Sequence, residues 1–202
     1  MEPGLPGGKA RWALEYIAGF TGGVMILPFA GISNAYYKWK NKRLSRKTPP
    51  ETVVFTSGFD HQFKHPGLVA AVCDHYMYTP VVARQHRLGR AVKWVSNATK
   101  ETVLENLANE QYQNVVFIGH GSNSTYCTTD GDVTSEDIIE CDIRKKDGEL
   151  IQHTCGGGGG IPLREALLSN TDRGYTFERP IWLTENYIAA WTAFFGKKPT
   201  YK

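Results

Sequence analysis

The sequence predicts an α/β fold: a three-layer αβα sandwich with a mainly parallel central sheet, preceded by a hydrophobic N-terminal helix. Short β-branched runs alternate along the chain with segments whose apolar residues recur at helical spacing. Such alternation favours a parallel sheet with helices on both faces. The chain has 202 residues, of which 41% are hydrophobic and 21% charged, which is enough for one domain with a core.

Four runs are predicted to be buried strands. Each is short, rich in apolar or β-branched residues, and bounded by residues that favour turns. These runs cover residues 52–56, 91–95, 115–119 and 149–154. A further strand is predicted at 180–184.

The segments between the predicted strands have helical signals. Thr99 is a predicted N-cap, and Thr134 to Asp137 has the spacing of a capping box. The predicted helices cover residues 65–78, 99–108, 134–139, 161–169 and 185–195.

Residues 16–37 carry no charge, and this stretch is close to the roughly 20 residues that cross a bilayer as a helix. Six of the 23 basic residues follow in the run 38–47. The positive-inside tendency then places the rest of the chain in the cytoplasm. We therefore predict an N-terminal segment 1–47 with a single membrane anchor, and a cytoplasmic domain 48–202.

Two alternatives for this N-terminal stretch stay open. Its glycines and Pro28 make a mediocre helix, so that it could instead lie on a membrane surface or pack on the domain. It could also be a signal peptide, with a poor cleavage site at residues 33–35.

Charge and cysteine usage exclude other classes of function. From Thr48 onward, 15 Lys and Arg stand against 18 Asp and Glu, a net charge of −3, so we expect no nucleic-acid partner. The four cysteines show no Cys-x-x-Cys spacing, and we expect reduced thiols. No His and Cys spacing matches a zinc finger, and we expect neither metal nor cofactor.

Reactive side chains follow two of the predicted strands. His120 comes directly after the strand 115–119, and Cys155 directly after 149–154. In open α/β sheets the chemistry lies at the carboxyl ends of the strands. An imidazole beside a thiol can act as base to a nucleophile. The run 156–160 is all glycine and leads toward a helix near Pro162, whose positive end would favour a thiolate.

An apolar strand ending in His120-Gly121 and a later one ending in Cys155-Gly156 resemble the caspase-like cysteine peptidases of clan CD. The polar loop and short helix at 129–137 are similar to the segment that follows His-Gly in those proteins. The resemblance runs from about Thr52 to Ser169. The interval from His to Cys is 35 residues, shorter than the roughly 50 of caspases, which points to a compact, prokaryotic-style relative.

The resemblance implies a cysteine endopeptidase that cleaves a protein or peptide partner at the membrane. His120 would be the general base and acid, and Cys155 the nucleophile. Backbone N–H groups of Gly121, Cys155 and Gly156 would bind the oxyanion. The alternative is a catalytically inert caspase-like domain that acts as a membrane-anchored recruitment module. Candidate substrate-binding residues are acids that would accept a basic side chain and an arginine that would accept an acidic one: Asp130, Asp132 and Arg84.

Overall fold

A computed structural model describes residues 30–57, 66–177 and 190–191 of this chain. Its centre is a five-stranded sheet, in which every strand pairing is parallel. The strands lie in the order β2-β1-β3-β6-β7. Their bounds are β1 Thr52–Ser57, β2 Val92–Ser96, β3 Asn114–Gly119, β6 Leu150–His153 and β7 Gly174–Tyr175.

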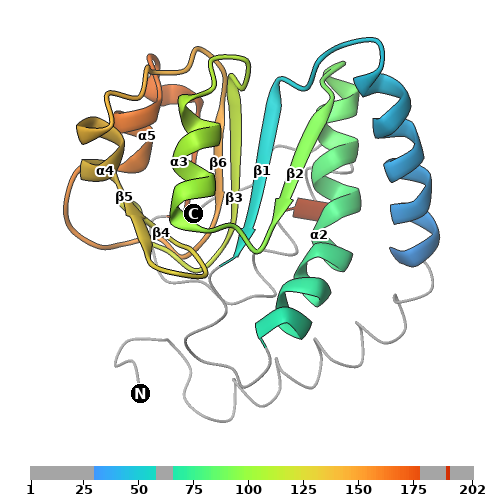
Figure 1. Cartoon of the computed structure of the whole chain (residues 1–202), viewed down its shortest axis with the longest axis horizontal. Coiled ribbons are helices and arrows are strands. Elements are labelled where there is room, and N and C mark those ends of the chain that lie inside the picture. Colours follow the sequence, from blue (N-terminus) through green and yellow to red (C-terminus); the bar gives the residue numbers. More distant parts are fainter. Residues whose placement is uncertain (1–29, 58–65, 178–189, 192–202) are drawn as a thin grey trace.

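Helices cover both faces of this sheet, so the predicted α/β architecture with a mainly parallel sheet is confirmed (Figure 1). The helices are α2 Pro66–Arg87, α3 Lys100–Ala108, α4 Ser135–Glu140 and α5 Leu163–Leu167. Residues 30–45 are also helical. A separate antiparallel hairpin is formed by β4 Thr125–Cys127 and β5 Asp132–Thr134.

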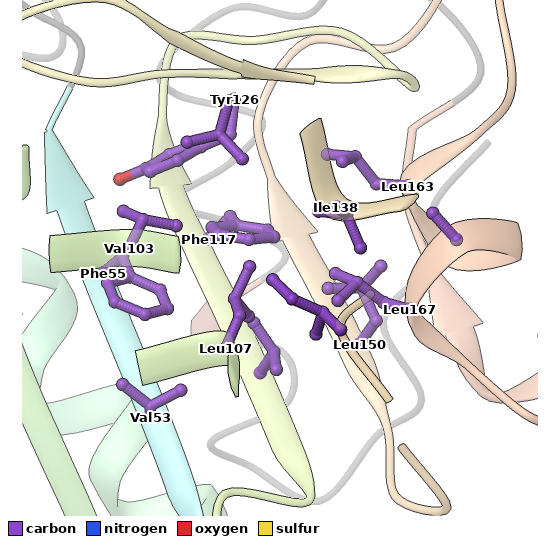
Figure 2. Packing of buried hydrophobic residues seen from close by; sticks show 14 of the residues in the cluster. Val53, Phe55, Val103, Leu107, Phe117, Tyr126, Ile138, Leu150, Leu163 and Leu167 are labelled. Atoms are coloured by element: carbon purple, nitrogen blue, oxygen red, sulfur yellow. The ribbon is translucent and has the colours of Figure 1, made fainter. Parts of the chain in front are cut away.

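One face of the sheet packs against α3, α4 and α5. Val53 and Phe55 of β1 and Phe117 of β3 point into this layer, because alternate residues of a strand face the same side (Figure 2). The rings of Phe55 and Phe117 stack, with centroids 5.6 Å apart. The helices contribute Val103, Leu107, Ile138, Leu163 and Leu167, all fully buried.

The other face packs against α2. The intervening residues Val54 and Val116 point to this side, where they meet Val81 and Val82 of the helix. Two buried faces explain why the strands read as continuous apolar runs. Helix α2 continues to Arg87, beyond the predicted end at residue 78 and through Pro80, because its apolar spacing continues along this face.

Both predicted helix caps are confirmed. The Thr99 hydroxyl accepts a hydrogen bond from the Thr102 N–H. Thr134 and Asp137 form a complete capping box. The predicted strand 180–184 lies outside the described residues, as does most of the predicted helix 185–195, of which residues 190 and 191 are described and helical.

The helix over residues 30–45 packs on the domain rather than standing apart from it. The Asn34 side chain donates to the His75 carbonyl oxygen of α2 (2.7 Å). The Asn41 side chain bonds both the N–H and the carbonyl oxygen of Val92, on the edge strand β2. The predicted domain boundary after residue 47 therefore falls between two segments that pack against each other. Among the residues described, no helix has the length and apolar character needed to cross a membrane.

A buried carboxylate ties α2 to the amino edge of the sheet. Glu149, directly before β6, accepts two hydrogen bonds from Arg84 at 2.8 Å and one each from Gln85 and Arg90. Burial alone would raise the pKa of Glu149, but the bonds and charges of these partners hold it below its usual value.

We predict that Glu149→Gln lowers the free energy of unfolding at pH 7 by about 2–3 kcal/mol, because it leaves two partly buried guanidinium groups without their counter-charge. Since the folded pKa is lowered, the Glu149 contribution is complete above about pH 4.3 and declines as the pH falls through the folded pKa. Urea unfolding at pH 7 and pH 3 measures both effects. The control Glu110→Gln removes an exposed ion pair with Arg144 and should cost less than about 1 kcal/mol. Equal losses in the two variants would contradict the prediction.

Candidate active site

His120 stands where β3 ends. The strand lies between β1 and β6, and its residues from Asn114 to Ile118 are buried. Gly119 then has a φ of 143°, a backbone conformation that favours glycine and turns the chain out of the sheet. His120 follows at once and is half-buried, so the imidazole lies at the carboxyl edge of the central strand.

Cys155 stands at the same edge on the neighbouring strand. β3 and β6 pair in parallel, and the last paired residues are Ile118 and His153. Two residues beyond this pair come His120 on one strand and Cys155 on the other. Both residues therefore follow neighbouring parallel strands at the same edge of the sheet. Cys155 is half-buried.

Gly121 makes a close backbone approach to the β4 strand. It pairs with Tyr126 as an isolated antiparallel bridge. The bonds of this bridge run from the Ser122 N–H to the Thr125 oxygen (2.8 Å) and from the Cys127 N–H to the His120 oxygen (3.1 Å). In such a pair the N–H of the bridging residue points away from its partner strand. The Gly121 N–H thus faces away from β4, as an oxyanion donor requires.

Hydrogen bonds join the loop after His120 to the segment that holds Cys155. The buried Gln152 side chain of β6 donates to the Ser122 carbonyl oxygen (3.1 Å). The Asn123 N–H donates to the Gly157 oxygen (3.0 Å), and the Ser124 hydroxyl to the Gly159 oxygen (2.7 Å). These three bonds hold the two halves of the site at a fixed separation. The polar run directly after His120-Gly121 is the sequence signal for these bonds. Its bonding partners could not be predicted from the local pattern alone.

The backbone conformation of the run 156–160 accounts for several of its glycines. Gly157, Gly158 and Gly160 have φ values of 88°, 96° and 96°, which side chains rarely adopt. A Cβ on Gly158 would also lie 3.1 Å from the Ser122 side chain. Gly156 itself is buried beside Cys155. The run lets the chain fold back against the loop that follows His120.

The helix predicted near Pro162 is α5, which has only five residues, begins eight positions after Cys155 at Leu163, and has no side-chain cap. Assistance to the thiol from the dipole of this helix stays a prediction.

Cys127 and Asp132 lie next to the candidate pair. They face each other across the β4–β5 hairpin, and Cys127 bonds through its N–H to the His120 oxygen. Burial, together with the neighbouring charges of Asp132 and Cys155, raises the pKa of the Cys127 thiol to about 12. Cys127 therefore stays protonated near neutral pH and is a poor nucleophile. Because Cys127 bonds to His120 at the carboxyl edge of the sheet, its cross-strand partner Asp132 lies near that edge as well.

The other two predicted substrate-binding residues have structural partners. Asp130 accepts the Lys100 N–H at the start of α3 (2.7 Å), which lowers the pKa of its carboxyl below the usual value. Arg84 pairs with Glu149 at the amino edge of the sheet, opposite His120 and Cys155. The structure therefore does not bring Arg84 to the site. No group of three metal-ligating side chains occurs within the described ranges.

Comparison with solved structures shows a distant structural likeness. The chain is similar to a solved structure described as pro-sf-caspase-1, with a TM-score of 0.37 and 12% sequence identity. The match covers 56% of this chain and 55% of that chain, so this chain spans about half the length of the structure it matches. No family model matches the sequence. No curated protein matches it either.

Gly121→Ala is expected to destabilise the site, because the added Cβ collides with the Thr125 carbonyl oxygen. We expect a loss of about 1–3 kcal/mol in the free energy of unfolding, as for other overpacked positions. Gly159→Ala is the matched control, since Gly159 has no positive φ and open space around it. Thermal unfolding of both variants makes the comparison, and equal melting temperatures would show that Gly121 has no steric constraint.

Proposed function

We propose that this protein is a cysteine endopeptidase in which His120 and Cys155 act as a catalytic dyad. One observation carries the proposal: β3 and β6 pair in parallel up to Ile118 and His153, and His120 and Cys155 each follow two residues later at the same edge of the sheet. A nucleophile with an adjacent base is the minimum that thiol catalysis of acyl transfer requires. The bonds between the loop at Ser122 and the chain after Cys155 support a preorganised site.

The chemistry would proceed through a thioester. His120 takes the proton of the Cys155 thiol, and the sulfur attacks the carbonyl carbon of the scissile peptide bond. The N–H groups of Gly121 and of Cys155 or Gly156 bind the resulting oxyanion. His120 then gives its proton to the leaving amine as the C–N bond breaks. Water, deprotonated by His120, hydrolyses the thioester and restores the thiol.

The surroundings of the site favour a basic residue before the cleaved bond. Asp132 is exposed and lies beside Cys127, whose thiol is close enough to Cys155 for their charges to interact. Asp130 is engaged at the start of α3, and Arg84 pairs with a carboxylate at the opposite edge. Of the three predicted substrate-binding residues, Asp132 is thus the one that can meet a substrate. A carboxylate there attracts Lys or Arg.

We also propose that the N-terminal segment attaches this activity to a membrane, with the domain on the cytoplasmic side. The uncharged stretch 16–37 and the basic run 38–47 are the features that support attachment. The substrate would then be a protein or peptide reached from that membrane.

Covalent labelling with an electrophilic peptide probe tests the peptidase proposal. We expect labelling of the full chain to be lost in Cys155→Ala and to fall by about 100-fold or more in His120→Ala, because a general base contributes roughly 10²–10⁴-fold. Cys127→Ala is the control and should retain labelling, since its thiol stays protonated. A probe with Arg at the cleaved residue should react faster than one with Asp.

Equal labelling of the wild-type chain and the Cys155→Ala and His120→Ala variants would contradict the peptidase. It would favour the alternative, in which a catalytically inert caspase-like domain serves as a membrane-anchored interaction module.

A further inference from the structure

The helix over residues 30–45 presents an apolar stripe to solvent. Ile32, Tyr36 and Trp39 are 75%, 50% and 57% exposed. Their spacing of four and then three residues places them on one face of the helix. Among the described residues, the exposed large apolar side chains number six, and three of them lie on this stripe. The other three are scattered over separate elements: Leu88, Ile139 and Ile161.

Basic side chains continue this outer face and surround it. No acidic residue occurs between residues 30 and 50, whereas six exposed basic residues fall within 38–47. The Arg43 guanidinium lies 5.7 Å from the centre of the Trp39 ring, and the Lys40 ammonium 5.9 Å from that of Tyr36. Aromatic rings beside cations are typical of segments that lie at the headgroup level of a membrane.

Contacts on the opposite face fix the direction of this stripe. The Thr79 hydroxyl of α2 donates to the Asn34 side chain (2.6 Å) and also contacts the Ser33 hydroxyl (3.0 Å). His86 lies 2.9 Å from the Asn41 oxygen, and its burial lowers its pKa to about 4, so the ring is neutral at pH 7. The helix therefore runs beside α2 and cannot turn its outer face inward (Figure 1).

Because part of the uncharged stretch 16–37 packs on the domain, a shorter stretch is left that could enter a membrane. Ala30 and Asn34 are buried against the domain, so residues 30–37 are not surrounded by lipid on all sides as a membrane-spanning segment would be. The uncharged residues before them, 16–29, number fourteen. A helix needs about 20 apolar residues to cross a bilayer, and stretches of about 10–14 are more typical of interfacial segments.

We propose that the outer face formed by Ile32, Tyr36, Trp39 and the basic run lies flat on an anionic phospholipid surface. The inference rests on the membrane association proposed above but is independent of peptidase activity. An anionic leaflet complements this concentration of positive charge, and the stripe supplies the apolar area that inserts at the headgroup boundary.

Such attachment would also orient the domain. The helix contacts the sheet edge near Val92, where β2 begins, and its start at residue 30 lies toward the carboxyl ends of the strands (Figure 1). With this helix flat on the surface, the strands run along the membrane. The edge that carries His120 and Cys155 then opens sideways, where a membrane-bound substrate can reach it.

Binding of the full chain to phospholipid vesicles tests the surface. We expect binding to vesicles of phosphatidylcholine with phosphatidylserine, weak binding to phosphatidylcholine alone, and weakening by salt. Ile32→Ser with Trp39→Ser should weaken binding by about tenfold or more. The control, Leu88→Ser with Ile139→Ser, removes two exposed apolar side chains elsewhere and should bind as the wild type does. Equal binding of both double variants would overturn the proposal.

Quenching by brominated lipid locates Trp39 directly and does not depend on the total strength of binding. The chain has five tryptophans, so we compare the wild type with Trp39→Phe. We expect a clear loss of quenching in the variant. Equal quenching of the wild type and Trp39→Phe would show that this face lies away from lipid, as it would if the stripe covered a partner protein. That result would overturn the proposal. Peptide-probe labelling in the absence of vesicles is unaffected by either result, which separates this test from that of the dyad.

Discussion

Parallel pairing of β3 with β6 is the constraint on which the candidate site depends. Both strands are buried on two faces, and a slip of one residue would turn every side chain to the wrong layer. The packing of Phe117 and Val116 in opposite layers therefore fixes the register that ends at Ile118 and His153. The positions of His120 and Cys155 follow from that register. The hydrogen bond from the Ser124 hydroxyl to the Gly159 oxygen then joins the two segments that follow these strands.

The parts of this fold that periodicity governs could be predicted from the sequence. The four main strands, the cap at Thr99 and the capping box at Thr134 follow from local patterns, and the structure confirms them. The parallel pairing of β3 and β6, which His120 and Cys155 follow, could be predicted as well, because alternating strands and helices favour a parallel sheet. These features depend on neighbouring residues and on burial, both of which a sequence displays.

The remaining features depend on contacts between distant segments, which no local pattern carries. Arg84 looked like a possible anion-binding residue, but it pairs with Glu149, which is 65 positions away. The uncharged stretch 16–37 is typical of a membrane span, yet its last part is amphipathic and packs on α2 through Asn34. The hairpin β4–β5 was not predicted, because its strands have three residues each and only one buried side chain apiece.

Disulfide trapping at the two strand ends tests the central claim most directly. In a Cys127→Ser background, His120→Cys should form a disulfide with Cys155 under mild oxidation, because the proposed site requires the register of β3 and β6 to continue for two residues. The two Cα atoms would then lie within the roughly 7 Å that a disulfide permits. Ser96→Cys, at the end of β2 and three strands away, lies about 14 Å off by strand spacing and should not cross-link. Peptide mapping of the cross-linked chain identifies the pair. A cross-link from position 120 to Cys155 alone is the predicted result, whereas no cross-link, or equal cross-linking from position 96, would contradict the proposed site.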